Sequence, residues 1–74
     1  MKEKIYEIWR RNLDLDEFDC DDKFYEIGGN SIIFLMIIED INDEFGFQLP
    51  LEDVYEYETV NKMSAYLEQK LKKE

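Results

Sequence analysis

Apolar residues recur at helical spacing in three stretches of the chain, and no stretch shows the strict alternation that is typical of strands. The first stretch predicts a helix over Lys2–Arg11, because Ile5, Ile8 and Trp9 fall on one face of it. An early Glu3 and two arginines at the end suit the helix dipole. We expect Trp9 to anchor this helix to the core.

The strongest periodic stretch predicts a central helix over Ser31–Phe45, with Ser31 as its N-cap residue and Gly46 as its C-terminal stop. Five apolar residues of this helix share one stripe at about 100° per residue. They are Phe34, Ile37, Ile38, Ile41 and Phe45. We expect this stripe to form part of the core.

The opposite face of the central helix carries two large apolar residues, Ile32 and Met36. The carboxylates beside them are Glu39, Asp40 and Asp43. Single exposed apolar residues are ordinary, but two of them one turn apart and rimmed by charge more often mark a docking patch. We therefore treat this face as a candidate partner-binding surface.

The rest of the chain predicts a long loop, a short helix and a last helix. Asn12–Asn30 is rich in Asp and lacks periodicity, so we expect a loop with one helical turn around Lys23–Ile27. The single proline favours a short helix over Leu51–Tyr57. Thr59 is expected to cap a last helix over Val60–Leu71. The residues expected to pin the long loop to the core are Leu13, Leu15, Phe18, Phe24 and Ile27.

These elements predict an all-α fold, a small four-helix bundle of three longer helices and one short helix with a long first loop. With 74 residues the chain has room for one small domain, which we expect to span residues 1–74. A domain of this size buries only about 60% of the surface that its unfolded chain exposes. Because most enzyme pockets need more wall than that, the length favours a binding, carrying or scaffolding module over an enzyme.

Acidic residues outnumber basic ones by 19 to 9, which gives a formal net charge of −10. The excess is concentrated between Asp14 and Glu58, where 15 acidic residues accompany one basic residue, Lys23. An acidic surface repels phosphate groups, so we expect no nucleic-acid partner and no membrane partner. The same charge favours basic protein partners, although most single carboxylates on such a surface are simply solvated.

Several kinds of chemistry are excluded by residue type. The chain has no histidine, which removes a Ser-His-Asp triad, a Cys-His pair and any histidine-containing metal site made within it. A calcium loop beginning at Asp14 fails, because Asp19 stands where glycine is needed and Tyr25 where glutamate is needed. Cys20 has no partner for an internal disulfide, and we expect it to be a half-buried loop residue. No apolar run is long enough to cross a bilayer, and we expect a cytoplasmic protein.

One tetrapeptide, Gly28-Gly29-Asn30-Ser31, precedes the central helix. Two glycines let the backbone turn sharply and leave the serine uncrowded, and a helix N-terminus tolerates a phosphate nearby. From these four residues alone, a plain capping serine after a flexible loop is the simpler interpretation. The segment is not a P-loop, since no Gly-Lys-Ser/Thr follows, and it is not a nucleophile elbow, since Ile33 stands where glycine is needed.

The wider sequence changes that balance. The run from Asp22 to Ser31, Asp-Lys-Phe-Tyr-Glu-Ile-Gly-Gly-Asn-Ser, resembles the attachment motif of phosphopantetheine-dependent carrier proteins. The match continues through Phe34, Ile37, Ile41, Phe45-Gly46, Leu49-Pro50-Leu51, Val54-Tyr55-Glu56 and Thr59-Val60. The Gly-Gly pair is most similar to peptidyl carrier proteins, the thiolation domains of nonribosomal peptide synthetases. Fatty-acid acyl carrier proteins typically have Asp-Ser-Leu where this chain has Asn30, Ser31 and Ile32.

The resemblance implies an acyl-carrier-protein-like fold and a covalent cofactor. A phosphopantetheinyl transferase would attach 4′-phosphopantetheine from coenzyme A to Ser31, with Gly29 and Asn30 beside the attachment point. The terminal thiol of that arm would hold an aminoacyl, peptidyl or acyl group as a thioester. The monomeric, non-catalytic carrier would then meet an adenylating or acyl-loading ligase and downstream biosynthetic enzymes through their basic docking surfaces. The implied partner-binding residues are Ile32, Met36, Glu39, Asp40, Asp43, Val54 and Tyr55.

Two alternatives stay open at this point. An acyl carrier protein of polyketide or fatty-acid type would bear the same arm with a different cargo. An acidic adaptor without any prosthetic group would use the charge and the Ile32–Met36 face alone. Partner choice is also open, because Val54-Tyr55 replaces the more usual Leu-Phe of the resembled family, and Tyr57-Glu58 stands where a proline often precedes the threonine.

Overall fold

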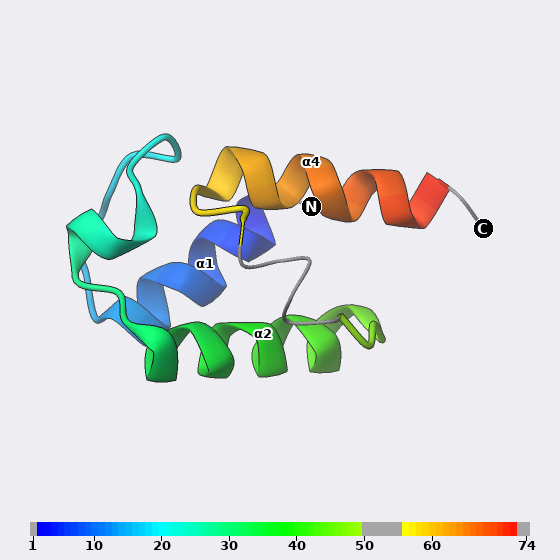
Figure 1. The fold of residues 1–74 in the computed structure, drawn as a ribbon, viewed down its shortest axis with the longest axis horizontal. Helices are drawn as coiled ribbons and strands as arrows, with labels where there is room; N and C mark the ends of the chain where they lie inside the picture. The colour runs from blue at the N-terminus through cyan, green and yellow to red at the C-terminus, as the bar shows by residue number, and fades with distance from the viewer. Residues whose placement is uncertain (1, 50–55, 73–74) are drawn as a thin grey trace.

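The computed structural model describes residues 2–49 and 56–72, and the described part is helical throughout its regular structure. It contains α1 (Lys2–Leu13), the 3-10 helix η1 (Phe24–Ile27), α2 (Ser31–Phe45) and α4 (Val60–Lys72). Helices α2 and α4 run in the same direction, and α1 packs against both of them (Figure 1). The expected all-α fold is therefore confirmed.

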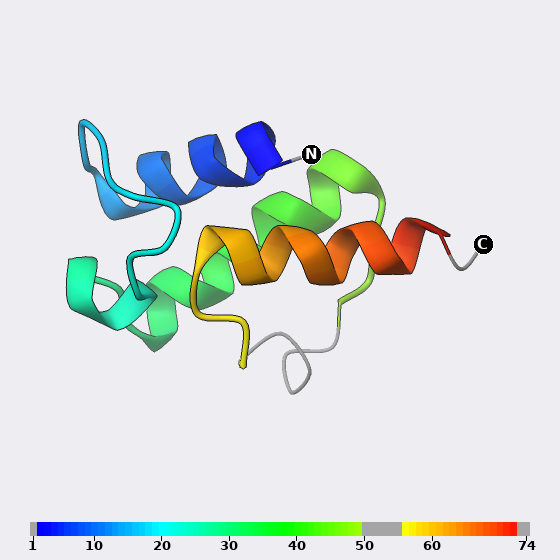
Figure 2. The same cartoon turned by 90° about the horizontal axis from the view of Figure 1, so that it is seen from above.

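The starts of α2 and α4 lie at the same end of the molecule, alongside η1 (Figures 1 and 2). The backbone ties these segments together, because the Phe24 N–H of η1 donates to the Glu58 carbonyl at 2.7 Å. A second link joins the long loop to α4, where Asn61 N–H donates to the Cys20 carbonyl at 3.2 Å. Cys20 is half-buried, as expected.

A single hydrophobic cluster lies where the three helices and η1 meet. Its fully buried side chains include Trp9 from α1, Phe24 from η1, Ile37 and Ile41 from α2, and Met63 from α4. The indole N–H of Trp9 donates to the Met63 sulfur at 3.4 Å, so the anchoring role expected for Trp9 is confirmed. Of the stripe expected on α2, Phe45 alone is partly rather than fully buried.

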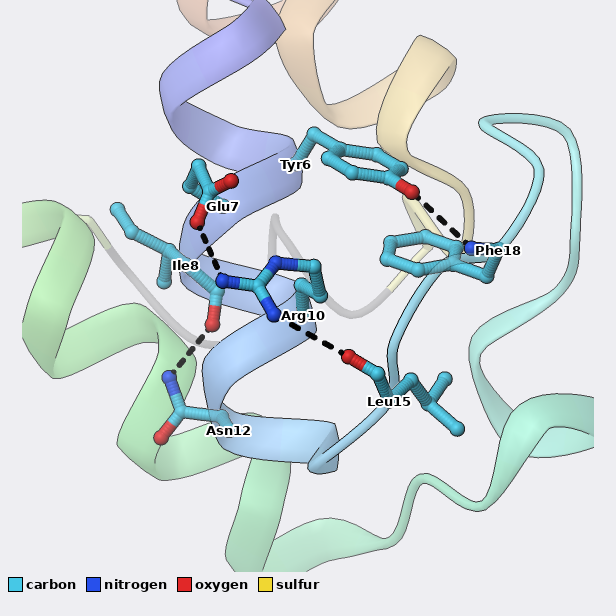
Figure 3. Close-up of polar contacts among 7 residues, drawn as sticks. All are labelled: Tyr6, Glu7, Ile8, Arg10, Asn12, Leu15 and Phe18. Carbon is cyan, nitrogen blue, oxygen red and sulfur yellow. Dashed lines mark hydrogen bonds and ion pairs between the residues drawn. The ribbon is translucent and has the colours of Figure 1, made fainter.

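Helix α1 ends two residues later than the sequence predicted, at Leu13 rather than Arg11. The Asn12 side chain donates to the Ile8 carbonyl at 2.8 Å and so stabilises the last turn (Figure 3). It also donates to Asp40 on α2 at 2.9 Å, and Leu13 packs on the core. The contact to Ile8 lies within the helix and the other two join it to the rest of the fold, and periodicity alone reveals none of them.

The loop after α1 is held by polar contacts rather than by regular structure (Figure 3). The Tyr6 hydroxyl accepts a hydrogen bond from the Phe18 N–H at 3.0 Å, and the two rings stack with centroids 4.5 Å apart. The Arg10 guanidinium donates to the Leu15 carbonyl at 3.4 Å. The helical turn expected around Lys23–Ile27 is present as η1.

Thr59 caps α4 as expected, since its Oγ1 accepts from the Lys62 N–H at 3.1 Å. The short helix expected over Leu51–Tyr57 lies almost entirely outside the described residues, as do the candidate partner residues Val54 and Tyr55.

Candidate functional site

The segment between η1 and α2 turns on its two glycines. Gly28 ends η1 in the left-handed conformation, with φ of 100°, which glycine adopts without a steric penalty. The N–H of Gly29 donates to the Phe24 carbonyl at 3.0 Å, which draws the chain back over η1. The two residues that follow are thereby delivered to the start of α2.

Asn30, and not Ser31, is the N-cap residue of α2, which corrects the sequence prediction. Asn30 is extended, with φ of −149° and ψ of 178°, and its side-chain oxygen accepts from the Ile33 N–H at 2.9 Å. Both side chains are chemically able to cap a helix, but the Gly-Gly turn places the extended residue at position 30. Ser31 becomes the first residue inside the helix.

Ser31 is exposed, and no hydrogen bond to its hydroxyl is found among the described residues. The chain has two other aliphatic hydroxyls, Ser64 and Thr59, and both are buried, at 4% and 6% exposure. The Ser64 hydroxyl donates to the Asn61 carbonyl at 3.1 Å, and the Thr59 hydroxyl caps α4. Of the three aliphatic hydroxyls, Ser31 is therefore the one that another molecule can reach.

The surroundings of Ser31 suit a phosphodiester. Because Asn30 satisfies the Ile33 N–H, the first-turn donors without an intrahelical acceptor are the N–H groups of Ser31 and Ile32. They point toward the helix N-terminus, where the dipole favours negative charge. The first turn of α2 holds no acidic residue that would repel a phosphate. The residues present thus fit a covalently attached phosphate-linked arm.

An exposed apolar face on α2 begins beside the serine. Ile32 is 71% exposed and Met36 is 47% exposed, as the periodicity predicted. Leu35, at 48% exposure, belongs to the same face, although it is not among the residues predicted to lie there. It lies four residues after Ser31 and hence one turn below it, a relation that the helical spacing already contained. We call Ile32, Leu35 and Met36 the apolar patch.

The acidic residues predicted beside the patch divide into two groups. Glu39 and Asp43 are exposed along α2, where a partner could meet them. Asp40 is half-buried and accepts the hydrogen bond from Asn12 of α1, so its carboxylate already has a structural role.

The shifted pKa values belong to surface pairs on α1 and at the far end of α2. A hydrogen bond from Lys4, at 2.7 Å, lowers the pKa of the Glu44 carboxyl. A hydrogen bond from Arg10, at 3.0 Å, lowers the pKa of the Glu7 carboxyl and raises that of Arg10. Since these carboxyl pKa values are lowered in the fold, the pairs help stability at neutral pH and stop helping as the pH falls through the folded pKa.

Two further findings concern the described residues. Their Cys, Asp and Glu side chains form no group of three that could hold a metal ion. None of their helices is long and apolar enough to cross a membrane.

Fold and site together define a small helical domain that presents one accessible aliphatic hydroxyl at a helix N-terminus. Comparison with known proteins shows which family this domain belongs to. The profile of the family described as "Phosphopantetheine attachment site" matches residues 3–67. The chain belongs to this family, whose members are non-catalytic carrier domains that bear 4′-phosphopantetheine covalently.

The curated relatives that the chain matches include large synthetases. The chain is 34% identical over 67 residues to indigoidine synthase of Dickeya dadantii (strain 3937), covering 90% of this chain and 4% of that protein. It is 32% identical over 68 residues to surfactin synthase subunit 2 of Bacillus subtilis (strain 168), covering 92% of this chain and 2% of that protein. The chain thus spans a few per cent of the length of these relatives. It is a carrier domain of the kind found in nonribosomal peptide synthetases.

Two of the solved structures that match the chain illustrate the shared fold. One is BlmI, a type-II acyl-carrier-protein from Streptomyces verticillus involved in bleomycin biosynthesis, with a TM-score of 0.89 and 26% identity over 95% of this chain and 84% of that one. The other is a chain from the complex of the phosphopantetheine transferase Sfp with coenzyme A and a peptidyl carrier protein. It matches with a TM-score of 0.84 and 25% identity over 92% of this chain and 88% of that chain.

Proposed function

We propose that Ser31 is the attachment residue for 4′-phosphopantetheine, and that the chain acts as a single carrier domain for an aminoacyl or peptidyl group. The observation that carries the proposal is the exposure of Ser31 against the burial of Ser64 and Thr59. The thiol at the end of the bound arm would hold the cargo as a thioester.

The neighbouring residues each have a task in this proposal. Gly29 brings the backbone back over η1, and Asn30 caps α2 so that Ser31 stands at its first helical position. The N–H groups at the helix start then face the phosphate that links the arm to the serine. The Ser31 hydroxyl would form a bond to the phosphorus that carries the arm, the pyrophosphate P–O bond of coenzyme A would break, and adenosine 3′,5′-bisphosphate and the serine proton would be released.

The partners we propose are the phosphopantetheinyl transferase, an adenylating ligase that loads the cargo, and downstream enzymes that receive it. The apolar patch supplies a small contact area, and the exposed Glu39 and Asp43 would meet basic residues around the partner's docking surface. Such a contact is small and partly electrostatic, which suits fast association and fast release. We place these encounters in the cytoplasm, where the single free Cys20 stays reduced.

Arm transfer tests the proposal directly. The chain is incubated with coenzyme A and a phosphopantetheinyl transferase of broad specificity, and its intact mass is measured. We expect one arm on the wild-type chain, none on Ser31→Ala, and one on the matched control Ser64→Ala. An unmodified wild-type chain, or an arm on Ser31→Ala, would contradict the assignment of Ser31.

The cargo is tested on the modified chain with adenylating ligases and with acyl-loading enzymes. We expect an aminoacyl thioester, which hydroxylamine releases and which Ser31→Ala does not form. Loading by acyl transfer alone would point to the polyketide or fatty-acid alternative. Partner binding that is equally strong in Ser31→Ala and without the arm would favour the acidic adaptor instead.

A further inference from the structure

Gly29 lies directly against the ring of Phe24. A Cβ atom at position 29 would come within 2.5 Å of the ring atoms Cδ2 and Cζ, and closer still to Cε2. Real Cβ atoms do not approach other heavy atoms so closely, so any larger residue at 29 must displace either the ring or the backbone. Gly28 differs, because open space surrounds the position of its Cβ and its requirement is the left-handed φ alone.

The Phe24 ring has little freedom to move away. It is fully buried and lies edge-on to Trp9 of α1 and Phe34 of α2, with ring centroids 5.2 Å and 5.5 Å apart. Its backbone is held on both sides, since the N–H donates to the Glu58 carbonyl and the carbonyl accepts from Gly29. Close-packed interiors resist such displacement. A side chain at 29 would therefore shift the backbone two residues before Ser31.

We propose that Phe24 and Gly29 form a steric stop that sets the position of the Ser31 hydroxyl for arm transfer. They are positioning residues, because neither presents the accepting hydroxyl. The ring limits how closely the backbone at Gly29 can approach the core. Because Asn30 connects Gly29 to α2, this limit also determines where the first turn of α2 lies. This inference rests on the proposed attachment at Ser31, and it adds the contact that determines how well the hydroxyl is aligned.

The expected signature is a loss of rate without a loss of recognition. Small errors in the placement of a reacting group cost large factors in rate. We expect Gly29→Ala to lower the kcat of arm transfer about tenfold, while the KM for the carrier changes less than about twofold because the apolar patch is untouched. The rates are compared at a temperature where circular dichroism shows each variant to be folded.

Gly46→Ala is the matched control for stability. Gly46 has a positive φ, 73°, which Gly29 lacks, and open space around its Cβ, and it lies at the far end of α2. We expect this variant to unfold at a lower temperature than the wild type and to accept the arm at the wild-type rate. Loss of stability alone would then be separated from misplacement of the hydroxyl.

A double-mutant cycle tests the contact itself. Phe24→Leu removes Cε2 and Cζ, two of the three ring atoms that a Cβ at 29 would meet. In the Phe24→Leu background we expect Gly29→Ala to cost less than about twofold in kcat, against about tenfold with the phenylalanine present. If Gly29→Ala alone does not fold, the kcat of Phe24→Leu is compared with that of the double variant. We again expect a difference of less than about twofold.

The outcomes separate this inference from the proposed function. Normal transfer to the wild type together with an unchanged kcat in Gly29→Ala overturns the steric stop alone. An equal, about tenfold loss in both backgrounds also overturns it, because the ring would then not be the obstacle. A wild-type chain that accepts no arm at Ser31 overturns the proposed function and this inference with it.

Discussion

Asn30 and Ser31 are adjacent polar residues with separate roles at the start of α2. The Asn30 side chain accepts from the Ile33 N–H, and the serine is thereby spared from capping and stays exposed. The sequence placed both residues at the helix start but assigned the cap to Ser31. The dihedral angles imposed by the Gly-Gly turn decide between them, and composition does not report those angles. The exposure of Ser31, which the site depends on, agrees with the sequence expectation.

A cap substitution tests this division at the level of single residues. Asn30→Ala removes the acceptor of the Ile33 N–H and should lower the free energy of unfolding by about 1 kcal/mol. Asn30→Asp keeps an acceptor at the helix N-terminus and should restore most of that loss. Urea unfolding monitored by circular dichroism measures both. Equal stability of Asn30→Ala and the wild type would show that Ser31 or water can replace the cap.

At the level of elements, one face of α2 packs in the core and the opposite face is exposed to solvent. The periodicity alone predicted both faces, because Ile37 and Ile41 are fully buried while Ile32 and Met36 are exposed. Gly46 correctly predicted where α2 ends, whereas the cap predicted at Ser31 lies at Asn30. Periodicity failed at the end of α1, where the Asn12 contacts to Ile8 and Asp40 add a further part-turn. Side-chain hydrogen bonds of this kind, within a helix or between helices, are not visible in the spacing of the apolar residues.

The two faces of α2 should respond differently to substitution. Ile37→Ala should cost about 2–5 kcal/mol of unfolding free energy, because it leaves a cavity in the core. Ile32→Ser and Leu35→Ser should change stability by less than about 0.5 kcal/mol, since both side chains are exposed. The same two changes should reduce loading by the adenylating ligase. Normal loading of both variants, measured on chains that already bear the arm, would place the docking surface elsewhere.

At the scale of the whole molecule, the charge is far from neutral. The formal net charge is −10, and the described residues contain two ion pairs, Lys4–Glu44 and Glu7–Arg10, both on the surface. Exposed pairs of this kind add little stability. The excess of carboxylates should therefore repel itself in the folded chain while it attracts basic partners. The excess of negative charge could be predicted from the sequence, since it depends on the numbers of acidic and basic residues and not on geometry.

Salt should separate these two effects of charge. Raising sodium chloride from about 0.02 M to about 0.3 M shortens the screening length to less than 10 Å. We expect the unfolding temperature to rise by a few degrees, because self-repulsion is screened. The association rate with a basic partner should fall over the same range. An unfolding temperature that falls with salt would mean that the two ion pairs outweigh the repulsion.

Attachment of the arm at Ser31 is tested by locating the arm on the chain. Trypsin cleaves after Lys23 and Lys62, and the peptide 24–62 between them contains Ser31 as its one serine. After treatment with coenzyme A and a phosphopantetheinyl transferase, fragment-ion mass spectrometry of this peptide should place the whole added mass on Ser31. An arm on any other residue, or none on a folded wild-type chain, would show that Ser31 is not the attachment residue.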